Sequence, residues 1–214
     1  ATNTAGELRL GLGSEIIQAV ETKQQIIVFT DTTLYAMQFL GPPYTFGVNA
    51  ISEKISIISP NAAVAVDDIV IWMGKEEFYL YQGSVQKIPC TVRDFVFDAL
   101  QSDQQEKVVA GLNSSFSEVW WFYPSNSQDI NKYVVYNYAE QSWAIGSLSR
   151  TAWMDRGLFD FPVASVNNYL YDHERGFDDG ENNTAVSSYI ESSPVDLGEG
   201  DNFGFISRII PDIT

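Results

Sequence analysis

The sequence predicts an all-β protein in which antiparallel four-stranded meanders stack as an arc of a β-propeller, with one short amphipathic helix between repeat units. Three observations favour this fold class: recurring short apolar segments, segments that are apolar on both faces, and a weak internal repeat. The chain has 214 residues, of which 45% are hydrophobic and 14% aromatic. It is therefore long enough to bury a sizeable core as one domain or two small ones.

Short apolar segments bounded by turn residues recur along the chain. They are rich in the β-branched and aromatic residues that fit a pleated surface, and their length suits strands. Connections such as Asp31–Thr33 and Gln82–Ser84 are too short for a parallel crossover, so neighbouring strands must pair antiparallel. The predicted strands are Ile16–Val20, Ile26–Thr30, Leu34–Phe39, Ala62–Val66, Ile69–Met73, Phe78–Tyr81, Val85–Ile88, Val119–Tyr123, Tyr133–Tyr138 and Tyr169–Tyr171.

Several of these segments are apolar at every position. Ile26–Phe29 and Trp120–Phe122 place large side chains on both faces, because successive strand residues point to opposite sides. Almost no helix is available to cover those faces, so we expect sheets to cover sheets. Trp120 and Trp121 are accordingly predicted to be buried on opposite faces of one strand.

A weak repeat supports the stacked arrangement. Ala19-Val20, Ala65-Val66, Ala110-Gly111 and Ala164-Ser165 each precede an apolar strand, at spacings of roughly 45 to 54 residues that suit propeller blades. We therefore expect about four blade-like units within residues 1–214, as part of a longer chain. A Greek-key β protein, with short strands at similar intervals, stays the alternative.

One helix is predicted near residues 91–101, between the second and third units. Thr91 and Asp94 have the spacing of a capping box, and a second box at Ser102–Gln105 suggests a further helical turn. The helix is expected to dock on the sheets through an apolar stripe of Val92, Phe95, Val96, Ala99 and Leu100.

Nucleophilic catalysis has few candidate residues. His173 is the only histidine, so a Ser-His-Asp or Cys-His arrangement would need it. Cys90 is the only cysteine, lies in another repeat unit and follows a strand end, which favours a packing role. A lone cysteine also makes no internal disulfide and indicates a reducing compartment. We therefore expect no enzyme activity.

Paired carboxylates are the other catalytic pattern, because many propellers are glycosidases that use two of them. The Ser-x-Asp-x-Gly-x-x-Trp box of sialidase propellers is absent. Candidates that could face a cleft are Asp155, Asp160, Asp172 and Glu174.

Metal and cofactor motifs are also missing. No pair of Cys or His has ligand spacing, and Asp178–Asn182 lacks the alternating ligands of an EF-hand loop. Gly11–Ser14 has two of the glycines of a dinucleotide fingerprint without a following helix pattern, so it is interpreted as a turn. We expect no catalytic, cofactor-binding or metal-binding residues.

The charge balance restricts the partners. With 28 acidic and 12 basic residues, the net charge of −16 repels polyanions and argues against sequence-specific nucleic-acid binding. An acidic wall would also let DNA pass without holding its phosphates. No apolar run approaches the roughly 20 residues of a membrane-spanning helix, so no membrane span is expected.

Three stretches together carry a family resemblance: Gly13–Tyr35, Asn113–Tyr138 with its Glu118-to-Pro124 run, and Arg150–Gly157. They resemble structural virion proteins of tailed bacteriophages, of the tail nozzle or hub kind, along most of residues 13–214. The resemblance implies a propeller-containing, hexameric protein below the portal and adaptor, through which DNA leaves. It implies no catalytic residues.

The expectation is thus a structural component of a phage tail that forms subunit contacts and a channel wall for DNA passage. It would be assembled in the host cytoplasm, reside in the virion, form a ring such as a hexamer, and contact tail proteins such as the adaptor or portal. The alternative is a carbohydrate-active or receptor-binding tail propeller. Exposed Trp and Asp along a groove would favour that alternative, whereas aromatic residues between sheets would favour the wall.

Overall fold

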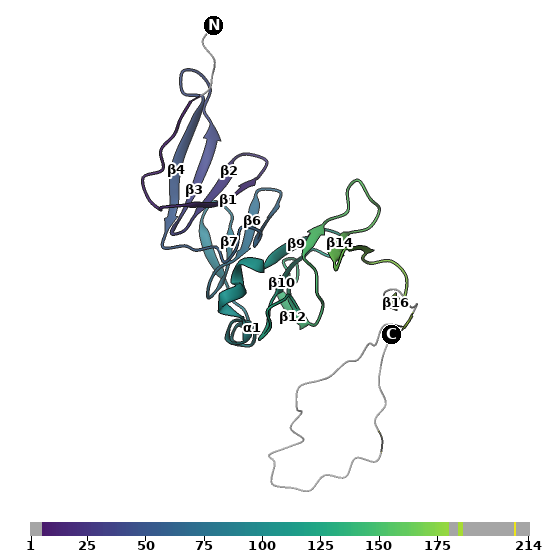
Figure 1. Cartoon of the computed structure of the whole chain (residues 1–214). Coiled ribbons are helices and arrows are strands. Elements are labelled where there is room, and N and C mark those ends of the chain that lie inside the picture. The colour runs from purple at the N-terminus through teal and green to yellow at the C-terminus, as the bar shows by residue number, and fades with distance from the viewer. Residues whose placement is uncertain (1–5, 180–183, 186–207, 209–214) are drawn as a thin grey trace. The chain divides into compact units, whose positions relative to one another are not determined.

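A computed structural model describes residues 6–179, 184–185 and 208 (Figure 1). The chain divides into two compact units, Ala1–Arg175 and Gly176–Thr214. The described part of the second unit contains a strand pair, β16 (Asp178–Asp179) and β17 (Thr184–Ala185). The loop Asp178–Asn182 discussed above lies largely outside the described residues. All the sites considered below belong to the first unit.

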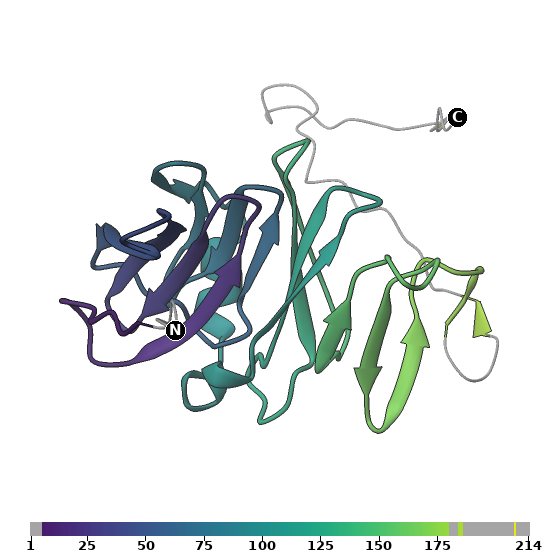
Figure 2. The same ribbon diagram turned by 90° about the horizontal axis from the view of Figure 1, so that it is seen from above.

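The first unit consists mostly of antiparallel meander sheets in which the strands follow one another in chain order (Figure 2). The first sheet contains β1 (Ile16–Glu21), β2 (Ile26–Thr30), β3 (Thr33–Phe39) and β4 (Phe46–Glu53), and the second contains β5 (Ala63–Val66), β6 (Ile69–Met73), β7 (Phe78–Tyr81) and β8 (Val85–Ile88). The third contains β9 (Val109–Asn113), β10 (Glu118–Tyr123), β11 (Lys132–Asn137) and β12 (Ser142–Gly146), and the fourth contains β13 (Ala152–Met154), β14 (Val163–Val166) and β15 (Tyr169–Asp172).

All the predicted strands are confirmed to within one or two residues, as is the antiparallel pairing across their short turns. The sequence did not indicate β4, β9, β12, β13 or β14, because these strands are short or have an apolar pattern interrupted by polar and small residues. The residue pairs that suggested the repeat do not all occupy the same position in their sheets. The first three pairs lie in the first strands β1, β5 and β9 of their sheets, whereas Ala164-Ser165 lies in the second strand of the fourth sheet, β14.

The first strands of successive sheets lie side by side, β1 next to β5, β5 next to β9 and β9 next to β13. Asn61 and Val109 form a parallel bridge between the second and third sheets, and the Ala110 N–H donates to the Asn61 carbonyl over 2.7 Å. The sheets therefore stack in chain order along their first strands (Figure 2).

Both faces of the second sheet are buried, as the doubly apolar strands predicted. On one face Trp72 packs edge-on against Phe29 of the first sheet, with ring centroids 5.1 Å apart. On the other, Phe78 contacts Trp121 of the third sheet at 4.9 Å. One core of buried residues runs through the first three sheets and includes Val96 of the helix.

The two adjacent tryptophans of β10 point to opposite faces, as predicted. Trp121 is fully buried against the second sheet. Trp120 faces the fourth sheet, where it stacks on Trp153 with ring centroids 5.7 Å apart, and it is only half-buried. The prediction that both are fully buried was wrong for Trp120, because the fourth sheet covers only part of that face.

The predicted helix is α1 (Arg93–Ala99), which packs Phe97 on Phe78 with ring centroids 5.3 Å apart. The residue at its N-cap is Val92, with no side-chain cap, so the predicted capping box from Thr91 is wrong. The second box coincides with a 3₁₀ helix, Ser102–Lys107, which also lacks a side-chain cap. Within the described part of the chain, no helix is long and apolar enough to cross a membrane.

Candidate functional site

His173 follows β15 and lies on the face of the fourth sheet that contacts the third. Its ring packs on Trp153 with centroids 4.7 Å apart, and its Nε2 accepts a hydrogen bond from Arg150 Nε at 2.8 Å. Burial and the neighbouring guanidinium lower the pKa of His173 to about 4. A neutral imidazole that accepts from Arg150 and packs on Trp153 connects the end of β15 to the start of β13 within the fourth sheet.

The four candidate carboxylates are distributed among separate contacts. Asp155 accepts from the backbone N–H of Ser114 at 3.2 and 3.3 Å, and Asp172 pairs with Arg175 at 2.7 Å. Glu174 accepts from the Asn113 amide at 3.2 Å. The fourth, Asp160, lies in the exposed loop before β14.

Cys90 packs against the core and is half-buried, and burial raises the pKa of its thiol to about 11. A thiol with so high a pKa is a poor nucleophile at neutral pH. No described group of three or more His, Cys, Asp and Glu side chains is arranged to hold a metal ion. The sequence stretch Gly11–Ser14 forms bends. The backbone N–H and the hydroxyl of Ser14 donate hydrogen bonds to the Asp31 carboxylate at 2.8 and 2.7 Å.

The third and fourth sheets are joined by Trp153, which belongs to the Arg150–Gly157 stretch. Its indole N–H donates to the Leu112 carbonyl at 2.8 Å, and its ring stacks on Trp120 and Phe122, both at 5.7 Å. Gly111 lies directly beneath this ring, where a Cβ atom would come within 2.4 Å of the Trp153 Cγ. The glycine therefore permits the close approach of the two sheets.

A polar cluster lies at the rim of the same contact. Asn113 ends β9, Glu118 begins β10, and Glu174 follows β15. Burial raises the pKa of Glu118, and the neighbouring Glu174 and Glu140 raise it further, while a hydrogen bond from Trp120 opposes the shift. Only Glu174 was a candidate from the sequence, because Asn113 and Glu118 become neighbours through strand pairing alone.

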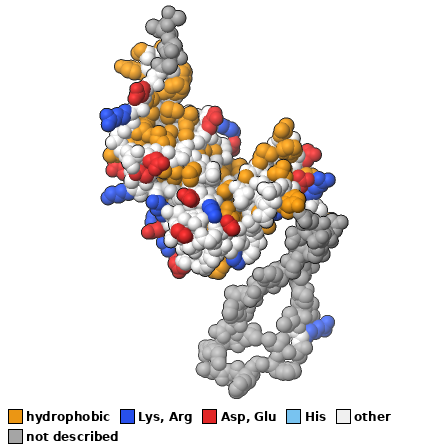
Figure 3. All heavy atoms as spheres, in the orientation of Figure 1, with side chains coloured by type: hydrophobic (Ala, Val, Ile, Leu, Met, Phe, Trp, Pro, Cys, Tyr) orange, Lys and Arg blue, Asp and Glu red, His pale blue; other side chains and the backbone are white. Residues whose placement is uncertain are grey.

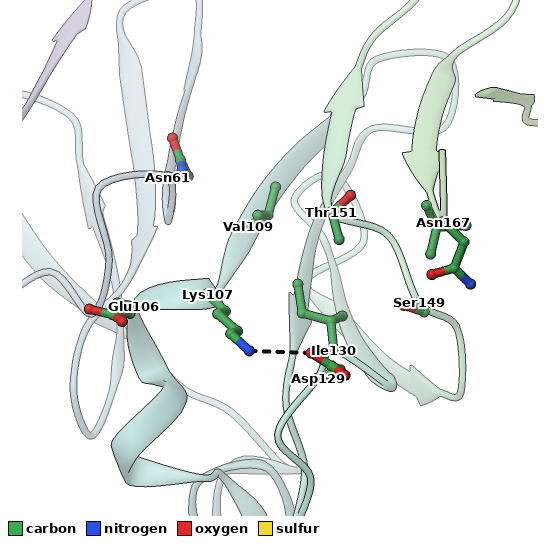
Figure 4. A pocket seen from close by; sticks show the side chains of 10 residues that line it. Asn61, Glu106, Lys107, Val109, Asp129, Ile130, Ser149, Thr151 and Asn167 are labelled. Atoms are coloured by element: carbon green, nitrogen blue, oxygen red, sulfur yellow. Dashed lines mark hydrogen bonds and ion pairs between the residues drawn. The ribbon is translucent and has the colours of Figure 1, made fainter. Parts of the chain in front are cut away.

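A cavity of about 490 Å³ lies near the starts of the first strands (Figure 4). A Lys107–Asp129 ion pair of 3.2 Å crosses it. None of the candidate residues from the sequence lines this cavity. Its lining consists of Asn61, Glu106, Lys107, Val109, Asp129, Ile130, Ser149, Thr151, Val166 and Asn167.

The outward face of the first sheet, away from the second, carries apolar side chains. N-terminal residues cover part of it, since the Tyr35 hydroxyl accepts from the Leu12 N–H at 2.7 Å and donates to the Leu12 carbonyl at 2.8 Å. Farther along the β3–β4 hairpin, the rings of Phe39 and Phe46 contact each other at 5.7 Å and are exposed. Figure 3 shows hydrophobic side chains, in orange, over the region of β3 and β4.

The outward face of the fourth sheet is also apolar. Directly paired residues share a face, so Ala152, Ser165 and Leu170 lie together, opposite to Trp153. Met154 lies on the same face, 46% exposed, and Leu170 is 77% exposed. Within the part of the chain that the structure describes, both end sheets of the stack thus present exposed apolar side chains.

The negative charge is unevenly distributed along the sequence. Residues 176–214 contain eight acidic and one basic residue, a net charge of −7. The remaining 175 residues carry −9, with 20 acidic and 11 basic residues. The stacked sheets are therefore less acidic per residue than the composition of the whole chain suggests.

Comparison with known proteins finds similarity in structure but no match in sequence. No family model and no curated protein matches the chain. It is similar to the extracellular domain of a one-component system from B. thetaiotaomicron, with 10% identity and a TM-score of 0.50 over 79% of this chain and 22% of the other. It is also similar to the Neurospora crassa Pan2 WD40 domain, with 14% identity and a TM-score of 0.43 over 72% of this chain and 44% of the other. The chain thus spans less than half of either structure, and the first likeness supports the fold alone.

Proposed function

We propose that this chain is a non-catalytic structural module, an arc of a β-propeller, in the tail of a phage virion. The proposal rests on the resemblance of the three sequence stretches to nozzle- or hub-like tail proteins. The structure supports a packing role for those stretches: Trp121 lies in the core, and Trp153 joins two sheets. Such a module contributes wall and subunit contacts.

The observation that carries the proposal is the pair of uncovered outward faces. In a stack of sheets each inner sheet has both faces covered, whereas each end sheet presents one face outward. Exposed apolar patches of this kind mark sites of interaction with other proteins. Phe39 and Phe46 at one end, with Met154 and Leu170 at the other, are therefore the side chains through which the module contacts further copies or other tail proteins.

The tryptophans support the wall over the sugar-binding alternative. A carbohydrate site would present indole rings along a groove, yet Trp72 and Trp121 are fully buried. Trp120, Trp143 and Trp153 are each half-buried between sheets or elements, and each indole N–H donates to a protein oxygen. The aromatic content of the chain thus stabilises its own stack.

An incorporation experiment tests the assembly role. In a phage that encodes the chain, Leu170→Lys should exclude it from virions, because a charge on the outward face prevents an apolar contact from forming. The side chain is exposed, so the variant should fold. Leu158→Lys is the matched control, because Leu158 is 91% exposed in a loop. Incorporation of both variants, or absence of the wild-type chain from virions, would contradict the proposal.

A turnover assay tests the absence of catalysis. The purified chain is expected to hydrolyse neither polysaccharide, nor ester, nor peptidoglycan. Turnover above a blank that disappears in Asp155→Asn, Asp160→Asn or Glu174→Gln would show that the carboxylates form an active site after all. That result would favour the depolymerase alternative.

The proposal also includes a role for the chain in the wall of a channel through which DNA passes. A basic wall would bind phosphates and release counterions, which would slow the moving duplex. The chain, with its net charge of −16, avoids such binding. We expect no retention of duplex DNA by the purified chain at physiological salt, measured by electrophoretic shift. Tight, salt-sensitive binding would argue against a channel wall.

A further inference from the structure

The rim between the third and fourth sheets brings together side chains that are distant in sequence. Asn113 and Glu118 are directly opposite each other in the β9–β10 pair, so they share a face with Cβ atoms about 4.5–5.5 Å apart. Gly111 and Trp120 lie on the same face, and both contact Trp153 of the fourth sheet. Asn113 and Glu118 therefore face the fourth sheet as well.

Asn113 has an unsatisfied oxygen at this place. The residue is fully buried, and its Nδ2 donates to Glu174 Oε1 at 3.2 Å, but its Oδ1 has no hydrogen-bond partner. Both atoms belong to one amide, so Oδ1 lies within the same polar cluster as the Glu174 carboxylate. Buried acceptors without a partner are rare, and a bound ion is one of the explanations for them.

The carboxylates around Asn113 lack cationic partners. Glu118 Oε2 accepts from the Trp120 indole N–H at 3.0 Å, and Glu174 reaches only Asn113. Among the described residues, neither carboxylate forms an ion pair with Lys or Arg.

We propose that a divalent cation, Ca²⁺ in preference to others, binds between Asn113 Oδ1 and the carboxylates of Glu118 and Glu174. All three ligands are oxygens, which calcium prefers, and water would complete the coordination. The exposed Glu174 leaves the position open to solvent. With only two carboxylates the affinity is modest, with a dissociation constant on the order of 10⁻⁴ to 10⁻³ M.

The proposal departs from the sequence-based expectation of no metal site and is independent of the proposed function. A bound cation would connect β9 and β10 of the third sheet to the segment that follows β15. It would thereby strengthen the contact that holds the fourth sheet.

Terbium luminescence with the full chain tests the site. Tb³⁺ occupies oxygen-ligand calcium sites, and Trp120 touches Glu118, so excitation of tryptophan should produce Tb³⁺ emission that Ca²⁺ displaces. Trp120→Phe should lower the emission, because it removes the indole that contacts Glu118. Absence of both emission and calorimetric binding in the wild-type chain would overturn the proposal.

Conservative variants locate the site. Glu118→Gln and Glu174→Gln should each weaken Ca²⁺ binding about tenfold or more, because each removes a charged ligand. Asp160→Asn removes the same charge from an exposed loop and should bind like the wild type. Circular dichroism checks that each variant is folded. Equal affinity in all three variants would place the ion elsewhere and overturn the assignment, as would a loss in Asp160→Asn as large as in the other two.

Discussion

The contact between the second and third sheets differs in kind from the contact between the third and fourth. The former is made by fully buried Phe78 and Trp121 within the core that extends through the first three sheets. The latter is an aromatic layer around Trp153, which lies outside that core, with a polar rim. Three sheets therefore share one apolar core, and the fourth is attached to it.

This difference indicates where the molecule opens first. Regions with few buried apolar contacts open with a smaller free energy than the global unfolding reaction. The fourth sheet has three short strands, and its outward face is uncovered. It should therefore open while the first three sheets stay folded.

The largest effect is expected for Trp121. Trp121→Ala leaves a cavity in the shared core and should lower the free energy of unfolding by about 3–5 kcal/mol, measured by urea denaturation. Trp120→Ala, on the opposite face of the same strand, is the matched comparison and should cost about half as much, because that side chain is half-buried. Equal losses would show that the two contacts do not differ.

A smaller effect is expected for Gly111. In Gly111→Val the new side chain meets the Trp153 ring, so the fourth sheet should be displaced at a cost of about 1–3 kcal/mol. Hydrogen exchange should accelerate in β14 and β15 and remain slow in β6. Gly157→Ala is the control, because its Cβ would meet no atom within 4 Å. Acceleration throughout the chain would mean that the fourth sheet is not a separate unfolding unit.

The smallest effect concerns pH. The pKa of His173 is lowered to about 4 in the folded chain, against an ordinary 6.5, so folding favours the neutral imidazole. The associated stability is fully present above pH 6.5 and is lost as the pH falls toward 4. Between pH 7 and 5 the wild type should lose about 1 kcal/mol more than His173→Gln, after allowance for partial exposure.

Urea midpoints at the two pH values measure this loss. The comparison with His173→Gln removes the contribution of the carboxylates, which titrate in both proteins. Protonation should act on the fourth sheet, so hydrogen exchange at pH 5 should accelerate in β15 before β6. An identical pH dependence in both proteins would mean that neutral His173 does not stabilise the fourth sheet.

The sequence by itself determined ten of the fifteen strands β1–β15, their antiparallel pairing and the need for sheets to cover sheets. Ile26–Thr30 and Ile69–Met73 were recognised to the residue, because apolar β-branched runs bounded by turns are local signals. The capping box at Thr91 was predicted from local residue spacing alone, and this prediction was wrong. Of the predicted stripe, Val96 is buried, and Val92 and Leu100 pack against the core. Phe95 is exposed, so its predicted docking was wrong, and Phe97 contacts the second sheet instead. The helix begins at Arg93 regardless of the available cap.

Only the tertiary structure decided which face of each sheet is covered and which side chains meet at the rim. Trp120 and Trp121 are equivalent in the sequence pattern, yet one faces a complete sheet and the other a shorter one. Asn113 and Glu174 are 61 residues apart and meet only because the third and fourth sheets stack. Strand formation follows from the alternation of neighbouring residues, whereas burial and charge compensation depend on contacts between distant ones, which a single sequence does not encode in any local period.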